Sequence, residues 1–89
     1  MNSQRTRVVV YRSNRSIEAQ AIDGGRVLLG RKYFFKKNKV QSAEAFGQDF
    51  GKELAAKGNK KIVFDRNHFR YHGIIKAFAE GLRKSKLEF

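Results

Sequence analysis

The sequence has no cysteine and no proline, and it has no apolar run near the roughly 20 residues that span a bilayer. Without cysteine, the chain can form neither disulfides nor thiolate metal sites. Without proline, no stretch is typical of a stiff linker, and we expect one domain over residues 1–89. The first five residues lack the apolar segment of a secretory signal. These absences predict a cytoplasmic protein with no membrane partner.

Acidic residues are also scarce. Eight Asp and Glu stand against 20 Lys and Arg, which gives a formal net charge of +12 on 10.3 kDa. Residues 1–39 contain ten basic and two acidic residues, net +8, whereas residues 40–89 contain ten and six, net +4. A charge of this size favours a polyanion as partner, either nucleic acid or an anionic membrane. The alternative is a charged surface that serves solubility alone.

Groups that could catalyse a reaction are few. Only Asp65, His68 and His72 cluster in the sequence, and general acid–base catalysis needs titratable groups that converge in a pocket that excludes water. The two histidines have the spacing of metal ligands on a helix, but the segment is predicted to be a loop, where this spacing loses its meaning. A hydrophobic content of 40% supports one modest core without a deep substrate pocket. We expect no enzyme, metal, cofactor or small-molecule substrate.

The first part of the chain has the pattern of strands. Residues 7–12 are β-branched and aromatic, residues 16–23 alternate between apolar and polar, and residues 26–30 form a third apolar segment. Residues 13–15 and Asp23-Gly24-Gly25 are turn signals. These features predict a three-stranded antiparallel meander, followed by a loop at residues 31–39, whose basic and aromatic residues show no clear period.

From Val40 the period becomes helical. An apolar stripe runs through Val40, Ala43, Phe46, Gly47, Phe50 and Leu54, with Asn38 or Ser42 as its expected cap and Gly58 just past its end. We expect Gly47 and Gly51 to allow close packing of this helix on the sheet. Residues 61–65 are typical of a buried fourth strand, and residues 73–85 of a last helix with Ile75, Phe78, Ala79 and Leu82 inside. The order β-β-β-α-β-α predicts an α+β two-layer sandwich, with a parallel fourth strand and two helices on one face.

Basic and aromatic residues interleave at residues 31–39 and again at residues 66–72. Phosphates are bound by Lys and Arg, whereas unstacked bases and riboses contact aromatic rings, amides and hydroxyls. A third candidate is the turn at residues 12–15, whose two guanidinium groups can bind phosphate through parallel hydrogen bonds. The alternative is that the rings belong to the core, and Phe34 and Phe35 individually fit either role. For the basic residues as a set, RNA is the favoured partner.

Several motifs occur in a definite order along nearly the whole chain. The most specific is Val63-Phe64-Asp65-Arg66, followed by Phe69-x-Tyr71-His72-Gly73 and Lys76-Ala77. Others are Arg12-Ser13-Asn14, Ile17-x-Ala19-Gln20-Ala21-Ile22-Asp23, Asn38-Lys39-Val40 before Gly47, and the final Leu87-Glu88-Phe89. In these motifs the sequence resembles the family of the universal ribosomal large-subunit protein eighteen, the bacterial-type 5S rRNA-binding protein of the central protuberance.

The resemblance implies the same α+β fold and a structural role: binding 5S rRNA and helping to attach it to 23S-type rRNA, beside neighbouring ribosomal proteins of the central protuberance. It implies a place in a cytoplasmic ribosome, with an organellar ribosome left open. By position, Gln20 would lie on the strand beside the first turn, and the loop before the last helix would lie at or near RNA. Charge and resemblance together predict these RNA-binding residues: Arg5, Arg7, Arg12, Ser13, Asn14, Arg15, Gln20, Arg31, Lys32, Lys36, Lys37, Lys39, Arg66, Phe69, Arg70, Tyr71, His72, Gly73 and Lys76.

Each of three departures from the family pattern removes a possible RNA contact. Only residues 2–7 stand where the family typically has a long basic arm before its first strand, Glu18 replaces a frequent tyrosine, and Ile74 replaces the usual arginine after the His-Gly pair. We hypothesise that the basic residues at 31–39 compensate. We also expect residues 1–39 to supply more of the binding energy than the rest of the chain.

Two other functions stay open on the residues alone. One is a different basic RNA-binding module, such as a ribosome-associated factor on a similar α+β scaffold. The other is a small nuclease. Loss of preference for 5S rRNA over a tRNA competitor would favour the first function. Cleavage of RNA that depends on added metal would favour the second.

Overall fold

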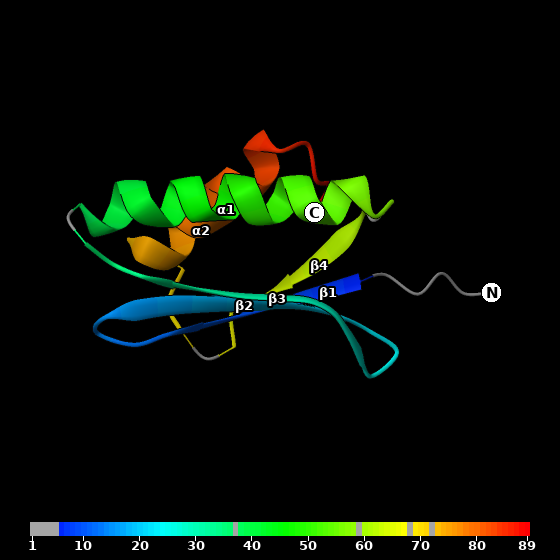
Figure 1. The fold of residues 1–89 in the computed structure, drawn as a ribbon, viewed down its shortest axis with the longest axis horizontal. Helices are drawn as coiled ribbons and strands as arrows, with labels where there is room; N and C mark the ends of the chain where they lie inside the picture. Colours follow the sequence, from blue (N-terminus) through cyan, green and yellow to red (C-terminus); the bar gives the residue numbers. More distant parts are fainter. Residues whose placement is uncertain (1–5, 37, 59, 68, 72) are drawn as a thin grey trace.

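The computed structural model describes residues 6–36, 38–58, 60–67, 69–71 and 73–89. Strands β1, β2 and β3 form an antiparallel meander, and β4 pairs in parallel with β1, so that the sheet order is β3-β2-β1-β4. Both helices cover one face of this sheet (Figure 1). The predicted α+β architecture is confirmed, with the elements β1 Thr6–Arg12, β2 Ser16–Asp23, β3 Arg26–Phe34, α1 Lys39–Ala56, β4 Ile62–Asp65 and α2 Ile74–Lys84.

The two faces of the sheet differ because side chains alternate along each strand. Val8 and Val10 of β1 pair with Ala21 and Ala19 of β2, and all four are buried under the helices. The predicted inward face of β2, which also includes Ile17, is therefore confirmed. The alternate residues of these strands, among them Tyr11, Glu18 and Gln20, lie on the open face, which no described helix covers.

Strand β3 is longer than predicted. It continues through residues 31–34, where a loop was expected, because β2 extends to Ser16 and pairs there with Phe34. The four residues do alternate: Tyr33 packs against the core, whereas Lys32 and Phe34 are exposed. The loop prediction was wrong for this part, since cross-strand pairing imposes a period of two on a segment whose charges hid it. The two-residue turn before β3 agrees with the sequence, with positive φ at both Gly24 (59°) and Gly25 (85°).

Helices α1 and α2 approach each other through glycines. A Cβ on Gly47 would lie 2.3 Å from the carbonyl oxygen of Phe78, and a Cβ on Gly81 would lie 2.2 Å from that of Glu44. At Gly51 the nearest atoms belong to Ser85. Close packing was predicted correctly but assigned to the wrong partner, because these glycines face the other helix and not the sheet.

The ends of α1 match the prediction in part. Gly58 follows the helix with φ 90°, as expected for a left-handed C-terminal residue. Asn38 occupies the N-cap position without a side-chain cap hydrogen bond, and Ser42 already lies inside the helix, so neither predicted cap forms. Val40 is 51% exposed and does not belong to the buried stripe, which begins at Ala43.

The last residues of the chain pack against β4. Leu87 is buried, the Ile62 amide donates to the Glu88 carbonyl (3.0 Å), and the Glu88 amide donates to the Lys60 carbonyl (2.7 Å). This short parallel bridge covers the start of the free edge of β4 and places the Phe89 ring 5.7 Å from the ring of Phe64.

Candidate nucleic-acid interface

The turn between β1 and β2 is built around Ser13. Its hydroxyl oxygen accepts hydrogen bonds from the amides of Arg15 (3.3 Å) and Ser16 (3.2 Å), and it lies 3.0 Å from the Ser16 hydroxyl. The Ser13 amide also donates to the Ser16 carbonyl (2.9 Å). Because Ser13 organises the backbone, the side chains of Arg12, Asn14 and Arg15 are held exposed at the tip.

The segment between β3 and α1 is attached to this turn. The Phe35 amide donates to the Arg15 carbonyl (2.8 Å), and Lys39 Nζ donates to the Asn14 carbonyl (2.9 Å). Lys39 also lies over the ring of Phe35, 5.7 Å from its centroid. The turn at residues 12–15 and the segment at residues 35–39 therefore form one surface, although Asn14 and Lys39 are 25 residues apart in the sequence.

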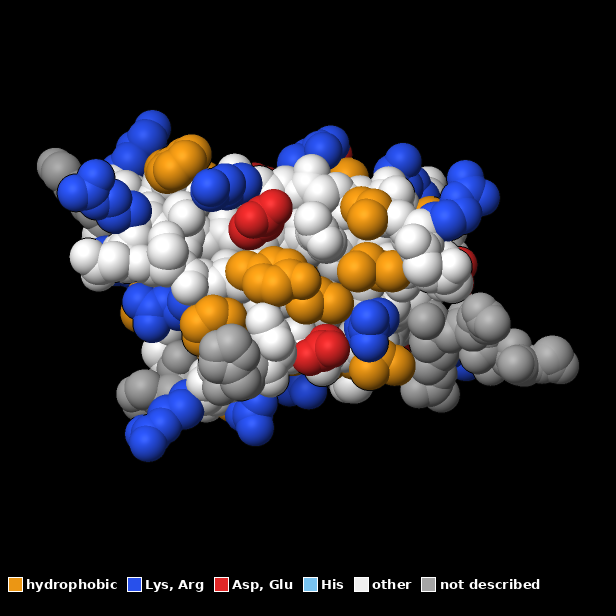
Figure 2. Space-filling view, turned by 90° about the horizontal axis from the view of Figure 1, so that it is seen from below, with side chains coloured by type: hydrophobic (Ala, Val, Ile, Leu, Met, Phe, Trp, Pro, Cys, Tyr) orange, Lys and Arg blue, Asp and Glu red, His pale blue; other side chains and the backbone are white. Residues whose placement is uncertain are grey.

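The open face of the sheet carries exposed rings next to this surface. Phe34 is 61% exposed, with Lys32 Nζ 5.0 Å from its ring centroid. Tyr11, Glu18 and Lys32 are register partners across β1, β2 and β3. Figure 2 shows this face, with a band of apolar side chains across its middle, acidic side chains within the band and basic side chains around much of its edge.

Tyr11 is a candidate that the sequence prediction missed. It is 40% exposed and lies on the open face in register with Glu18. The strand period contained the signal, because inward Val8 and Val10 require outward Val9 and Tyr11. Gln20, which was predicted, lies on the same face in register with Val9 and is partly buried.

The loop between β4 and α2 is ordered by its own backbone. The Asn67 amide donates to Asp65 Oδ1 (2.8 Å), and the Phe69 amide donates to the Arg66 carbonyl (3.1 Å). Phe69 packs against the core, so its ring anchors the loop, and Gly73 precedes α2 with φ 57°. Among the described residues of this loop, the exposed side chains are those of Arg66, Asn67, Arg70 and Tyr71, with Lys76 exposed on the first turn of α2.

All three predicted segments meet at one end of the molecule. β1 and β4 are parallel, so the turn after β1 and the loop after β4 lie at the same end, where α1 and α2 also begin (Figure 1). We call this region the basic end and define it by its exposed cations: Arg12, Arg15, Lys32, Lys36, Lys39, Arg66, Arg70 and Lys76.

Few of these cations are neutralised within the protein. Among the residues that the structure describes, no ion pair involves Arg12, Arg15 or Lys36. Within the same residues, no group of three or more His, Cys, Asp and Glu side chains could hold a metal ion. The electrostatic character of the basic end is thus that of an anion-binding surface.

Other predicted contacts are already engaged elsewhere. Arg31 points to the helix side, where its guanidinium binds both carboxylate oxygens of Glu53 (3.1 and 2.7 Å). Arg7 lies 3.8 Å from the Asp65 carboxylate on the open face. Both remain predicted RNA contacts, but each must share its charge with a carboxylate, in contrast to the cations of the turn.

One lysine outside the basic end has a perturbed pKa. Lys84 of α2 donates a hydrogen bond to the Glu44 carboxylate of α1, and this bond, together with the negative charge of Glu44, raises the pKa of Lys84 above 10.5. The pair joins the two helices, and the charge of Lys84 is therefore compensated by Glu44.

Three predicted RNA contacts, Arg5, Lys37 and His72, lie outside the described residues, as does His68 of the rejected metal spacing. For Phe34 and Phe35, which were compatible with either role, the structure separates the two: Phe34 is exposed and Phe35 is partly buried. None of the helices in the described part of the chain is long and apolar enough to cross a membrane.

Comparison with known proteins gives a consistent result. The family described as "Ribosomal L18 of archaea, bacteria, mitoch. and chloroplast" matches residues 1–89. The chain is 41% identical over 96 residues to the large ribosomal subunit protein uL18 of Thermotoga petrophila, covering 97% of this chain and 79% of the relative. It is 44% identical over 86 residues to uL18 of Helicobacter pylori (91% and 72% covered), and 37% identical over 94 residues to uL18 of Treponema denticola (98% and 78% covered).

Proposed function

We propose that this chain, which belongs to the ribosomal L18 family, binds 5S rRNA through its basic end and helps to attach it to the large-subunit rRNA of the central protuberance. Members of the family are structural constituents of the large ribosomal subunit and not enzymes. The chain accordingly belongs in the ribosome, with ribosomal RNA and ribosomal proteins as its partners. The proposal concerns which RNA it binds and with which surface.

The observation that supports the proposal best is the convergence of three separate segments at the basic end. The turn after β1, the segment before α1 and the loop after β4 present exposed cations at one end of the molecule. Backbone hydrogen bonds hold the segments that carry these cations in place. Cations on such fixed segments bind phosphates in a defined arrangement. Such an arrangement selects a folded RNA of matching shape over a generic polyanion.

Exposed rings add a second kind of contact beside the cations. Phe34 and Tyr11 lie on the open face, Phe34 under Lys32 and Tyr11 across Glu18 from it. Aromatic faces stack on unpaired bases and pack against riboses, which phosphate contacts alone cannot do. The open face next to the basic end is therefore suited to a loop or bulge of RNA, while the cations contact the flanking backbone.

The distribution of these groups agrees with the charge asymmetry of the sequence. Arg12, Arg15, Lys32, Lys36 and Lys39 all precede residue 40, and only the other three members of the basic end follow it. We therefore expect residues 1–39 to lose more affinity on mutation. Arg31 is the exception in this region, because its charge is paired with Glu53.

A gel-shift titration tests the specificity of the proposal. At about 150 mM salt, we expect 5S rRNA to remain bound under an excess of tRNA, because non-specific charge attraction is weak at this ionic strength. Equal competition by tRNA would instead favour a generic RNA-binding module. Cleavage of the RNA on addition of Mg²⁺ would favour a nuclease.

A second set of variants tests how much the basic residues at 31–39 contribute to 5S rRNA binding. We expect combined neutralisation of Lys32, Lys36, Lys37 and Lys39 to weaken 5S rRNA binding markedly, whereas Arg31→Gln has little effect. Binding is measured by the same titration, with thermal unfolding as a check on folding. Unchanged affinity of the lysine variant would show that these residues do not contact 5S rRNA.

A further inference from the structure

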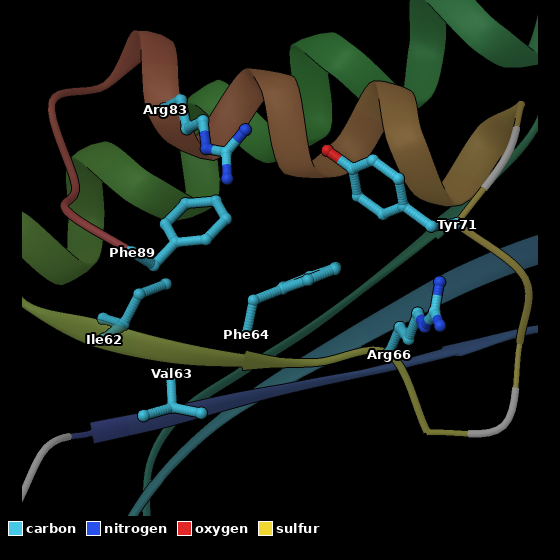
Figure 3. Close-up of a pocket in the computed structure, with 7 residues that line it drawn as sticks. All are labelled: Ile62, Val63, Phe64, Arg66, Tyr71, Arg83 and Phe89. Carbon is cyan, nitrogen blue, oxygen red and sulfur yellow. The ribbon is translucent and has the colours of Figure 1, made fainter.

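A cleft of about 440 Å³ opens at the edge of β4, away from the open face of the sheet. It is lined by Ile62, Val63, Phe64, Arg66, Tyr71, Arg83 and Phe89 (Figure 3). These residues come from β4, from the loop after it, from the last turn of α2 and from the C-terminal residue. The volume lies within the range of sites that hold small organic ligands.

Aromatic rings form the inner surface of the cleft. Figure 3 shows the Phe64 side chain between Phe89 on one side and Tyr71 on the other. The rings of Phe64 and Phe89 are 5.7 Å apart with an interplanar angle of 38°, and Tyr71 is 37% exposed. The core therefore fixes two of the rings, and the third lies on the exposed loop.

Guanidinium groups border the same cleft. Arg83 lies over the Phe89 ring, 4.5 Å from its centroid, and Arg66 extends from the end of β4 toward Tyr71 (Figure 3). None of the seven described residues that line the cleft is acidic. In the part of the chain that the structure describes, neither arginine forms an ion pair with a carboxylate. The cleft thus combines ring faces with two cations whose charge is not compensated.

We infer that this cleft binds a single unstacked nucleotide, with the base against Phe64 and Tyr71 and its phosphate against Arg66 or Arg83. Bases that leave an RNA stack are bound by aromatic side chains and arginine planes, and this cleft offers both within one small volume. The inference rests on the proposed function as a source of RNA. Arg66 and Tyr71 belong to the loop that reaches the basic end, so an RNA bound there can continue into the cleft.

A peptide strand from a neighbouring protein fits the cleft less well. A strand that adds to the edge of β4 would need the outward backbone groups of this short element. The Ile62 amide, however, already donates to Glu88 of the chain's own C-terminal segment. The cleft therefore offers side-chain surfaces rather than a free edge for strand addition, and its uncompensated positive charge favours a phosphate.

Titration of the ¹³C- and ¹⁵N-labelled protein, observed by NMR, tests the inference. The probes are adenosine 5′-monophosphate, uridine 5′-monophosphate, inorganic phosphate and an acidic pentapeptide with alternating Glu and Phe. We expect the nucleotides to shift the ring signals of Phe64 and Tyr71 in a saturable manner, whereas phosphate alone shifts only the arginine Nε signals. Unshifted ring signals with both nucleotides overturn the inference, as does saturable binding of the peptide in their place.

Matched variants distinguish stacking from general loss of structure. Tyr71→Leu should lower nucleotide affinity about fivefold or more, whereas Tyr71→Phe retains the ring and should stay near wild type. Arg83→Gln should also weaken binding, and Arg26→Gln on β3, the edge strand farthest from β4, serves as the charge control. If Tyr71→Leu and Tyr71→Phe bind alike, the base does not stack on Tyr71 and the inference is wrong.

The failure of this inference and that of the proposed function can be told apart on the same samples. If the cleft does not bind nucleotides while 5S rRNA binding depends on the basic end, only the inference fails. If 5S rRNA shows no preference over tRNA, the proposed function fails whatever the cleft binds.

Discussion

The salt dependence of RNA binding is the property that the basic end should control most directly. Consider a variant in which Arg12, Arg15, Lys36 and Lys39 are replaced by Gln. All four are exposed, and they lie on the hydrogen-bonded surface formed by the first turn and the segment before α1. Replacement removes four positive charges and lowers the formal net charge from +12 to +8.

The expected magnitude follows from counterion release. Each phosphate contact contributes roughly 0.7–0.9 to the slope of log K against log salt, so the loss of four contacts reduces the slope by about 3. Between 50 and 200 mM salt, this means that the affinity of the wild type falls about 60-fold more than that of the variant. Fluorescence anisotropy with labelled 5S rRNA over this salt range measures both slopes.

A control variant removes the same charge from the opposite end of the sheet. Arg26, Lys57, Lys60 and Lys61 are exposed near the β2–β3 turn, the end of α1 and the start of β4, and replacing them by Gln also gives a net charge of +8. We expect its slope to change by less than about 1, because these cations lie at the other end of the sheet from the phosphates bound by the basic end. Equal slopes for the two variants would mean that only net charge matters, and would refute the basic end as the binding surface.

Three further predictions concern the packing, the open face and the helix pair. Gly47→Ala should destabilise the protein by about 1–3 kcal/mol in urea unfolding, since its Cβ would overlap the Phe78 carbonyl, whereas Gly30→Ala, whose Cβ would meet nothing nearer than 3.8 Å, should change stability little; equal effects contradict the packing argument. Glu18→Gln should strengthen 5S rRNA binding about two- to fivefold in anisotropy titrations, because it removes a negative charge beside Lys32, and weaker binding would show that Glu18 contributes favourably. Because the pKa of Lys84 is raised in the folded state, its pairing with Glu44 stabilises the protein fully below pH 10.5 and loses this effect as the pH rises through the folded-state pKa; the stability difference between wild type and Glu44→Gln should therefore shrink above pH 10.5, and a difference that persists there is not due to this pair.

Local patterns in the sequence were enough for the element order and the faces of β2 and α2. Ile17, Ala19 and Ala21 are buried as their alternation indicates, and Ile75 and Phe78 as their helical spacing indicates. Each of these assignments depends on a period within one element. The period is visible in the sequence because one side of the element is apolar throughout.

Features that depend on pairing between distant segments were not predictable in this way. The extension of β3 is set by the length of its partner β2, and Arg31 is paired with a carboxylate 22 residues away. The glycines within α1 predict close packing against another element, but only the arrangement of the two helices identifies α2 as that element.

In the candidate site, too, the residue types were predictable from the sequence, whereas their arrangement in space was not. The cations of the basic end were predicted from composition and resemblance, yet their convergence depends on the parallel pairing of β1 with β4. Phe34 could not be assigned to core or surface, because it lies between two other aromatic residues, Tyr33 and Phe35, and three consecutive rings show no strand period. The cleft at Arg83 was missed altogether, since its residues come from four separate segments.

Ultraviolet cross-linking of the protein to 5S rRNA, followed by mass spectrometry of the linked peptides, tests the central claim most directly. We predict cross-links in the turn at residues 12–15, at Phe34 and in residues 35–39, with further links in the loop after β4. Cross-links confined to residues 57–61 and the β2–β3 turn would contradict the account, because they would place 5S rRNA at the opposite end of the sheet.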